Sequence, residues 1–469
     1  MTAPHAPSSE FLRKLNRVAF GFLLLLNLAA LYQLIYCLTH VGRMGEYFLN
    51  NAGLSLALCL LLLWGIRLRG ERRIQFFFAA LIGTLFVYTA EGLALTGKLG
   101  AQPNRAELAA KRGQPYDART PLQVIDDARL EGDALSFAFS PSEWFDYRRL
   151  EPETFANIFP LGGLSNTPTL LCNEGGEYAL FTADAQGFNN GEADLAAPLA
   201  RVLIGDSFTM GDCVAPEQNI AGHLRAALPG GVRNFGVRGS GPLFQLAALS
   251  EYAAPLRPKR VYWLYYEAND LDDLPREMAD ALLIRYLREP GFSQNLRDRQ
   301  EEIDGVLGRF FALSEEKIRS RAQPQSKGLK QVGKFLRLTA LKQALGIRLF
   351  PPEAPMAPEE GLIEILQAAQ QRTAAWGGEM ILVYLPSAER AFDQTPSHDY
   401  HRARLLQAAQ AMALTVLDFT PQLQQETEPE RLFPLGLPGH FNGQGYAAVA
   451  QMIAAYEKRQ VGQTAQAAP

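Results

Sequence analysis

The sequence predicts an α/β domain built on a parallel sheet and preceded by three helices that span a membrane. Beyond Arg201, short apolar runs alternate with amphipathic helical stretches, a pattern typical of a parallel sheet flanked by helices. Ahead of Thr96, the apolar residues gather in three long segments. A chain of 469 residues, 48% of them hydrophobic, fits two or three structural units.

The three apolar segments are Val18–Leu38, Phe48–Ile66 and Ile74–Leu95, and their only charged residue is Glu91. Each is close to the roughly 20 residues that a helix needs to cross a bilayer. Buried helices of a soluble domain would keep a polar face, and no small-residue cleavage site follows the first segment, which disfavours a signal peptide. Glu91 is expected near the outer interface, with a functional intramembrane acid as the alternative.

Basic residues set the predicted orientation. Three precede the first segment and four lie between the second and the third: Arg13, Lys14, Arg17, Arg67, Arg69, Arg72 and Arg73. By the positive-inside rule, the N-terminus is cytoplasmic. Three crossings of the cytoplasmic (inner) membrane then place everything after Thr96 in the periplasm or outside the cell. A formal net charge of −4 gives no reason to expect a nucleic-acid partner.

After the membrane anchor (1–95), the chain divides into a connector (96–150), a small β-rich cap (151–199) and the α/β domain (200–469) with a helical insertion (271–358). The connector contains one helical stretch, Pro121–Leu130, and Glu177–Thr182 in the cap has the alternation of a hairpin strand. In the insertion, Lys317–Arg348 carries nine basic residues and no acid. This stretch is interpreted either as the solvated face of lid helices or as a surface for anionic lipid or an acidic polymer.

The α/β domain has five strand-like runs: Arg201–Ile204, Val232–Val237, Arg260–Tyr266, Met380–Leu385 and Leu414–Phe419. Helical stretches follow most of them: Asn219–Leu228, Pro242–Leu256, Glu359–Trp376, His401–Met412 and Tyr446–Tyr456. Alternating units of this kind imply a parallel sheet with helices packed on it.

The four cysteines divide between the two parts of the chain. Cys37 and Cys59 fall inside predicted spans and are interpreted as small apolar packing residues. Cys172 and Cys213 lie in the exported part, where a disulfide between them would persist. It would tie the segment before the first strand of the α/β domain to the loop after that strand, provided that the two Cα atoms approach closely enough.

The stretch RVLIGDSFTMG at 201–211 delivers a serine to the end of the first strand. At the carboxyl end of a parallel strand, the hydroxyl of Ser207 would face the crevice where open α/β sheets bind ligands. A nucleophile and a helix cap are the two interpretations of such a serine. Asp206 is expected to cap the free N–H groups of the turn.

Three further blocks offer what a nucleophilic serine needs, namely a base and donors for the oxyanion. RNFGVRGSGPL at 233–243 is a glycine-rich turn in which Gly239 lets backbone N–H groups approach a ligand. YYEANDL at 265–271 places Asn269, followed by Asp270, at the same edge of the sheet as Ser207. PGHFNGQGY at 438–446 carries His440 in a loop before the last helix.

Together these four blocks resemble the SGNH (GDSL-type) hydrolase superfamily, which is named for Ser, Gly, Asn and His in four ordered motifs. The resemblance covers roughly residues 201–459 and implies a flavodoxin-like three-layer α/β/α fold. It implies Ser207 as the nucleophile and His440 as the general base. It also implies an oxyanion hole formed by Gly239, Asn269 and the backbone N–H of the serine. FTADAQGF at 181–188 resembles a motif of membrane-anchored members that act on cell-surface polysaccharides.

Two positions depart from the family pattern. Glu267 stands where the third block usually has glycine, and the acid that usually precedes the histidine by two or three residues is missing. In a triad this acid fixes the tautomer of the histidine, and its loss costs about 10⁴ in turnover. Three alternatives remain: a backbone carbonyl holds His440, an acid from elsewhere such as Asp418 replaces the missing one, or the site is weak or only binds.

The expected function is a membrane-anchored serine esterase that removes O-acyl groups, chiefly acetyl, from an acylated carbohydrate of the cell envelope or an exported polysaccharide. The first alternative is an O-acyltransferase working with a separate membrane protein that supplies the acyl donor. The second is a non-catalytic carbohydrate-binding or assembly protein. No metal or cofactor is expected, because no cluster of His, Cys and acids stands at ligand spacing. The other exported histidines, His223, His398 and His401, are interpreted as surface or packing residues.

Overall fold

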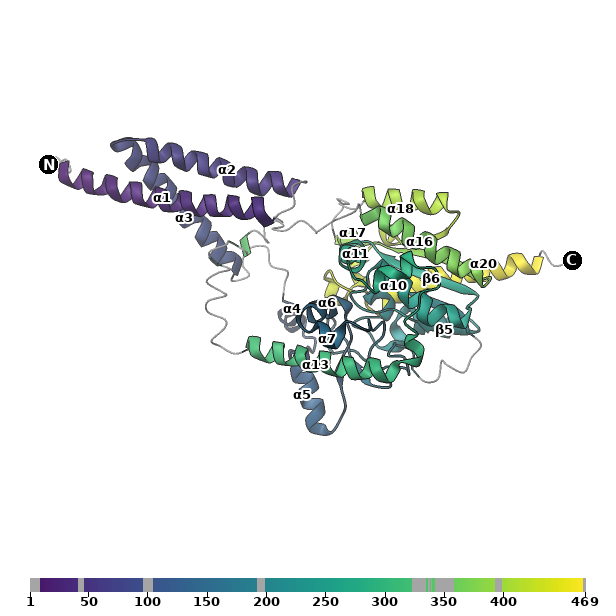
Figure 1. The fold of residues 1–469 in the computed structure, drawn as a ribbon. Helices are drawn as coiled ribbons and strands as arrows, with labels where there is room; N and C mark the ends of the chain where they lie inside the picture. The colour runs from purple at the N-terminus through teal and green to yellow at the C-terminus, as the bar shows by residue number, and fades with distance from the viewer. Residues whose placement is uncertain are drawn as a thin grey trace. The chain divides into compact units, whose positions relative to one another are not determined.

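The structure is a computed structural model, drawn in Figure 1, that describes residues 9–40, 46–95, 104–191, 199–322, 335, 338, 340, 341, 358–392 and 399–466. The chain forms two compact units. Residues Met1–Pro103 and Arg321–Glu353 make up the first unit, and residues Asn104–Ser320 and Ala354–Pro469 make up the second. The insertion in the α/β domain is therefore shared between the units.

The first unit contains three N-terminal helices, α1 (Ser9–His40), α2 (Glu46–Arg67) and α3 (Glu71–Leu95). Within the described residues, two stretches are long and apolar enough to cross a membrane, Ser9–Tyr32 and Glu71–Leu95. The apolar stretch of α2, Ser55–Arg67, is shorter. Length and composition alone also fit a signal sequence or a buried core helix, so the three-span anchor stays a prediction.

Glu91, the acid inside the third predicted span, is fully buried and accepts two backbone hydrogen bonds. The donors are the N–H groups of Ala340, at 3.1 Å, and Leu341, at 2.6 Å. Both belong to the stretch 321–353, which groups with this unit instead of the lid predicted over the α/β domain. Most of the basic stretch Lys317–Arg348 lies outside the described residues.

The second unit is built on a five-stranded sheet, β4 (Leu199–Ile204), β5 (Gly231–Asn234), β6 (Arg260–Tyr266), β7 (Glu379–Leu385) and β8 (Thr415–Asp418). All neighbours are parallel and their order is β5-β4-β6-β7-β8. Numbered along the chain this is 2-1-3-4-5, the order of flavodoxin-like sheets. The predicted α/β class with a parallel sheet is confirmed, and the strand order reverses direction between β4 and β6.

Helices cover both faces of this sheet. Alternate residues of each strand point to opposite faces, so Leu203 joins the core under α9 (Ile220–Ala227) and α20 (Gly443–Gln466). Val202 joins the other core. Among the helices that contribute to that second core are α10 (Pro242–Ala248), α11 (Asp270–Met278), α12 (Leu283–Arg288), α13 (Gln300–Ala322), α16 (Pro358–Ala375) and α18 (Asp399–Ala411). The result is a three-layer sandwich.

Residues 104–191 belong to the same compact unit as the five-stranded sheet, and their division into a connector and a cap stays a prediction. Their elements are α4 (Arg105–Lys111), α5 (Pro121–Glu131), β1 (Ser136–Phe137), α6 (Pro141–Leu150), α7 (Pro152–Phe155), β2 (Pro168–Leu170) and β3 (Leu180–Thr182). The three strands form a small sheet in which β2 pairs antiparallel with β3, as the hairpin prediction requires. Trp144 and Phe155 are fully buried in the core that contains Val202. These aromatic anchors explain why the predicted connector is part of the domain.

Candidate active site

Ser207 stands where β4 gives way to the short helix α8 (Ser207–Met210). Asp206 is the N-cap of α8, and its carboxylate accepts the N–H of Phe208 at 2.9 Å. The loop after β5 packs tightly against this turn, because a Cβ on Gly236 would lie 2.3 Å from the backbone nitrogen of Met210. The sheet thus presents the serine at the carboxyl end of β4, beside the point where the strand order reverses.

His440 faces the serine from the loop before α20. Its Nε2 lies 2.9 Å from Oγ of Ser207, and its ring packs on Phe208 with 5.1 Å between ring centroids. The two residues are 233 positions apart in the chain, and the fold joins them as the four sequence blocks predict. This distance lets the histidine accept the proton of the serine hydroxyl.

The acid partner of the histidine is Glu174, which the sequence analysis missed. Oε1 of Glu174 lies 3.0 Å from Nδ1 of His440, and Oε2 accepts the backbone N–H of the same histidine at 2.9 Å. The alternative acid, Asp418, is bound instead by Arg402 and by the N–H of Thr420 at 2.8 Å. Of the three alternatives, an acid from elsewhere in the chain therefore binds Nδ1 of His440, and that acid is Glu174 and not Asp418.

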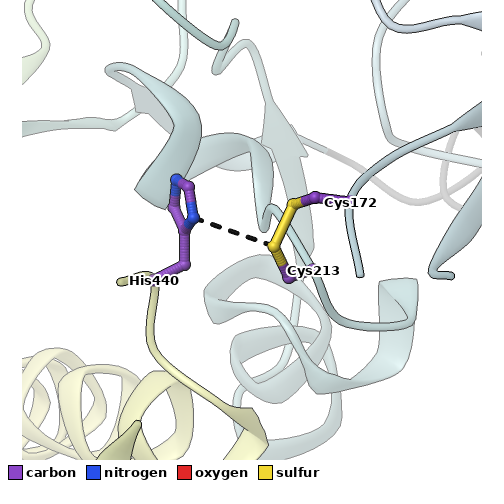
Figure 2. Close-up of side chains that lie close together, drawn as sticks. All are labelled: Cys172, Cys213 and His440. Atoms are coloured by element: carbon purple, nitrogen blue, oxygen red, sulfur yellow. Dashed lines mark hydrogen bonds between the residues drawn. A yellow bond between two sulfur atoms is a disulfide. The ribbon is translucent and has the colours of Figure 1, made fainter. Parts of the chain in front are cut away.

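A disulfide holds the acid next to the serine loop. Cys172 and Cys213 are bonded, with 4.6 Å between their Cα atoms. Cys172 precedes Glu174 by two residues, and Cys213 follows Ser207 by six. Figure 2 shows the disulfide beside the imidazole of His440, with Sγ of Cys213 3.7 Å from Nδ1. The structure thus contains the disulfide considered in the sequence analysis, and the two Cα atoms are close enough for it.

Arg105, at the start of α4, clamps the acid loop to the histidine loop. Its Nη2 donates to Oε2 of Glu174 at 3.3 Å and to the carbonyl of Pro438 at 2.7 Å. Its Nη1 donates to the carbonyl of Glu174 at 3.0 Å. A Cβ on Gly439 would lie 2.3 Å from Glu174 Oε2, so only glycine at this position lets the carboxylate approach so closely.

Asp212 adds a second buried carboxylate to the site. Its Oδ2 lies 3.7 Å from Nε2 of His440 and 3.0 Å from Nη2 of Arg238. The side chain is almost fully buried, and its backbone carbonyl accepts the hydroxyl of Tyr446. Asp212 therefore faces the histidine from the side of the serine, opposite to Glu174.

The predicted oxyanion donors occupy the loops that follow the two neighbours of β4. Gly239 follows β5 with φ of 66°, and a Cβ there would lie 2.8 Å from Oγ of Ser140. Asn269 follows β6 as the N-cap of α11, and its Oδ1 is buried without a hydrogen-bond partner in the described part of the chain. Both residues stand at the same sheet edge as Ser207, and their role as oxyanion donors stays a prediction.

Glu277 on α11 holds the end of the glycine-rich loop that follows β5. It is fully buried and accepts the N–H groups of Gly241, Leu243 and Phe244 at 2.6, 2.9 and 3.2 Å. These are free N–H groups at the start of α10, which a carboxylate caps well. Burial, followed by the charge of Asp273, raises the pKa of Glu277 to about 8.

The third block contains two further buried acids, of which Glu267 is the departure from the family pattern. Glu267, which replaces the usual glycine, is buried and accepts hydrogen bonds from Arg390 at 2.6 Å and from the N–H of Ser387 at 2.6 Å. This acid ties β6 to the segment after β7, and so has a structural partner. Asp270 is buried and accepts the N–H of Tyr266 at 3.0 Å, which closes the turn after β6.

The charges of the site favour a basic histidine. Burial lowers the pKa of His440, but the hydrogen bond with Glu174 and the charges of Asp212, Glu174 and Asp206 more than offset it, so the pKa is raised overall. Burial raises the pKa of Glu174, but the hydrogen bond and charge of His440 and the charge of Arg105 lower it overall. Burial raises the pKa of Asp206 to about 6. A protonated His440 is therefore stabilised by carboxylates on two sides.

A cavity of about 610 Å³ adjoins this site. Its buried lining residues are the polar Ser314 and five apolar residues: Leu122, Ala138, Leu170, Leu171 and Phe311. Ser140, Cys172 and Arg238 also line it, and each contacts a residue of the site described above. The cavity thus lies beside residues that surround the site, and neither Ser207 nor His440 lines it.

The site residues that the sequence analysis missed all lie outside the four sequence blocks: Arg105, Glu174, Asp212 and Glu277. Glu174 had one usable signal, because it stands two residues after a cysteine predicted to reach the serine loop. Arg105 and Glu277 had no such signal.

The other exported histidines are His223, His398 and His401. Nε2 of His223 on α9 lies 3.2 Å from the carbonyl of Gly443. His401 lies on α18, and His398 falls outside the described residues.

Comparisons with known proteins add little to this geometry. No family model and no curated protein matches the chain. Among solved structures, it is similar to the Bacillus subtilis protein YxiM, with 14% sequence identity and a TM-score of 0.30. The match covers 60% of each chain. A likeness this distant carries no argument about function.

Proposed function

We propose that this chain is a membrane-anchored serine esterase of the SGNH type that hydrolyses O-acyl esters of carbohydrate. One observation carries the proposal, namely the continuous hydrogen-bonded series from Ser207 through His440 to Glu174, at 2.9 and 3.0 Å. Nucleophile, base and orienting acid are arranged as in a catalytic triad. Glu174 takes the place of the acid that is missing from the usual position before His440, and this favours an enzyme over a purely binding protein.

The reaction follows from the roles of these groups. His440 takes the hydroxyl proton while Oγ of Ser207 forms a bond to the ester carbonyl carbon. The oxyanion is held by the serine N–H with Gly239 and Asn269, the predicted donors. His440 returns the proton to the departing alcohol, which leaves an acyl-enzyme. Water then attacks with the same histidine as base, and the carboxylic acid and free serine are released.

The substrate class rests on the resemblance to the SGNH superfamily and on the predicted membrane anchor. The cavity beside the site supports it, because a space of about 610 Å³ is much larger than an acetyl group and can hold further parts of an acylated sugar. If a sugar hydroxyl replaced water in the second step, the same residues would act as an O-acyltransferase. Genes for a membrane acyl carrier next to this one would favour that outcome.

The test uses the full chain in detergent micelles. Wild-type protein is expected to hydrolyse a chromogenic acetyl ester and to gain the mass of one fluorophosphonate group, while the Ser207→Ala variant does neither. Circular dichroism and melting temperature of the variant serve as the folding control. Folded wild-type protein that neither turns over the ester nor reacts with the fluorophosphonate would overturn the proposal and direct the search to glycan binding.

A further inference from the structure

The Cys172–Cys213 disulfide lies beside Glu174 and His440, and reduction would convert it to two thiols. Sγ of Cys172, Sγ of Cys213 and Nδ1 of His440 all lie within 4.8 Å of one another. Figure 2 shows the imidazole turned toward the sulfur of Cys213. Thiolates and imidazole are ligands that Zn²⁺ prefers. Two sulfurs bonded to each other offer no thiolate, so a metal can bind here only after reduction.

The positions of the ligand atoms fit a zinc site once the sulfurs separate. With Zn–S of about 2.3 Å and Zn–N of about 2.0 Å, tetrahedral coordination places sulfur and nitrogen about 3.5 Å apart. The distance from Sγ of Cys213 to Nδ1 of His440 is 3.7 Å. Oε1 of Glu174 lies 3.0 Å from the same nitrogen but does not belong to the group of ligand atoms that all lie within 4.8 Å of one another. Two sulfurs and one nitrogen therefore supply three protein ligands, and water can fill the fourth position.

We propose that reduction of the Cys172–Cys213 disulfide turns this corner of the site into an inhibitory Zn²⁺ site, with Nδ1 of His440 as the third protein ligand. The inhibition rests on the proposed esterase function, whereas the metal site does not. Spacing in the sequence does not suggest it, because the ligands come from three separate segments. The fold brings them together for another purpose.

The redox step needs an external dithiol. One thiolate of the dithiol attacks a sulfur of the disulfide, forms a mixed disulfide and releases the other cysteine. Its second thiolate then displaces the remaining cysteine, so the dithiol is oxidised to a disulfide and both cysteines are reduced. Binding of Zn²⁺ releases the two thiol protons.

Metal on Nδ1 stops the proposed catalysis through the tautomer of His440. In the oxidised protein, Nδ1–H donates to Glu174 and the lone pair of Nε2 faces the hydroxyl of Ser207. When Zn²⁺ occupies Nδ1, the proton of the neutral imidazole resides on Nε2. Nε2 is then a donor, and it cannot accept the serine proton. A histidine held in the wrong tautomer costs about 10⁴ in turnover in a Ser-His-Asp triad.

The experiment compares the full chain in detergent with its Cys172→Ser/Cys213→Ser double variant. Both are reduced with dithiothreitol, freed of it under nitrogen, and titrated with Co²⁺, whose thiolate charge-transfer absorption reports cysteine coordination without any assay of activity. Both proteins keep Cys37 and Cys59, which controls for the other thiols. Reduced wild-type protein is expected to bind one Co²⁺ that Zn²⁺ displaces, and the double variant is expected to show no such absorption.

Ester hydrolysis supplies the second measurement. Zn²⁺ is expected to lower the activity of the reduced wild-type protein at least about a hundredfold, reversibly on chelation, and to leave the oxidised protein and the double variant unaffected. Absence of the thiolate–cobalt absorption in the reduced wild type, or equal zinc inhibition of the double variant, would overturn the proposal. An oxidised protein that is inactive and unlabelled but still binds Co²⁺ after reduction would refute the esterase function and keep the metal site.

Discussion

The two edges of the parallel sheet hold buried carboxylates in opposite ways. At the amino edge, Glu457 on α20 accepts Nε of Arg201 at 2.7 Å, Nη1 of Arg260 at 2.5 Å and the hydroxyl of Tyr262 at 2.5 Å. At the carboxyl edge, Asp206, Asp212, Glu174 and others crowd around a single histidine. The first edge neutralises its acid, and the second concentrates negative charge.

The pKa directions record this difference. Burial raises the pKa of Glu457, but the hydrogen bonds from Arg201 and Tyr262 and the nearby arginines lower it overall. Burial raises the pKa of Asp206 to about 6, and the neighbouring Asp212 adds to the rise. Perturbed carboxylates around a histidine are a feature of functional sites, whereas paired ones are structural. We therefore expect changes at the carboxyl edge to alter rate and changes at the amino edge to alter stability.

The largest expected effect is on turnover at the carboxyl edge. Glu174→Gln removes the charge that orients and stabilises His440, so kcat for the chromogenic ester should fall about 10⁴-fold with little change in melting temperature. The matched control is Asp418→Asn, since the structure places that acid on Arg402. Equal losses in the two variants would contradict the assignment of Glu174.

The next effect is on stability at the amino edge. Glu457→Gln leaves two buried arginines without their shared carboxylate, which should lower the free energy of unfolding by about 3–5 kcal/mol. The kcat per folded molecule should not change. Denaturant unfolding measures the loss, and the exposed pair of Arg431 with Glu428 gives the control, since Glu428→Gln should cost less than about 1 kcal/mol. A fall in kcat with unchanged stability would break the comparison.

A smaller effect is expected from the clamp that joins the acid and histidine loops. Arg105→Ala removes the hydrogen bonds to Glu174 and Pro438, and the resulting misplacement should lower kcat about ten- to a hundredfold. Arg112→Ala is the control, because the side chain of Arg112 donates a hydrogen bond to the carbonyl of Leu435 at 3.0 Å. Partial recovery in Arg105→Lys, with one donor group restored, would separate positioning from loss of folding.

The smallest effect concerns pH. His440 must be neutral to act as a base, and its pKa is raised above the ordinary 6.5, so kcat/KM should rise with pH through a midpoint above 6.5. Asp212→Asn removes one of the charges that raise this pKa, and the midpoint should move to lower pH. A pH–rate profile of both proteins measures the shift. A midpoint that stays in place would show that Asp212 does not act on the histidine.

Much of the fold was accessible from the sequence because its signals are local. Each of the five strands of the main sheet overlaps an apolar run in the sequence. Ser207 and His440 each lie within a short sequence motif. The polar composition of 96–150 does not reveal that Trp144 is buried in the core, because that burial depends on tertiary contacts. Glu174 was missed because it comes from the cap, and the family pattern directs attention to the residues just before the histidine.

The position of Glu174 limits how this protein can be divided or recombined. Acid, nucleophile and base occur in the chain in the order Glu174, Ser207, His440, and the acid belongs to a segment outside the five-stranded sheet. A chimera that exchanges residues 104–191 for those of another protein would exchange the acid partner of His440 together with residues that line the adjoining cavity. Residues 104–191 and the five-stranded sheet must therefore be exchanged as one piece if the hydrogen bond between Glu174 and His440 is to be kept.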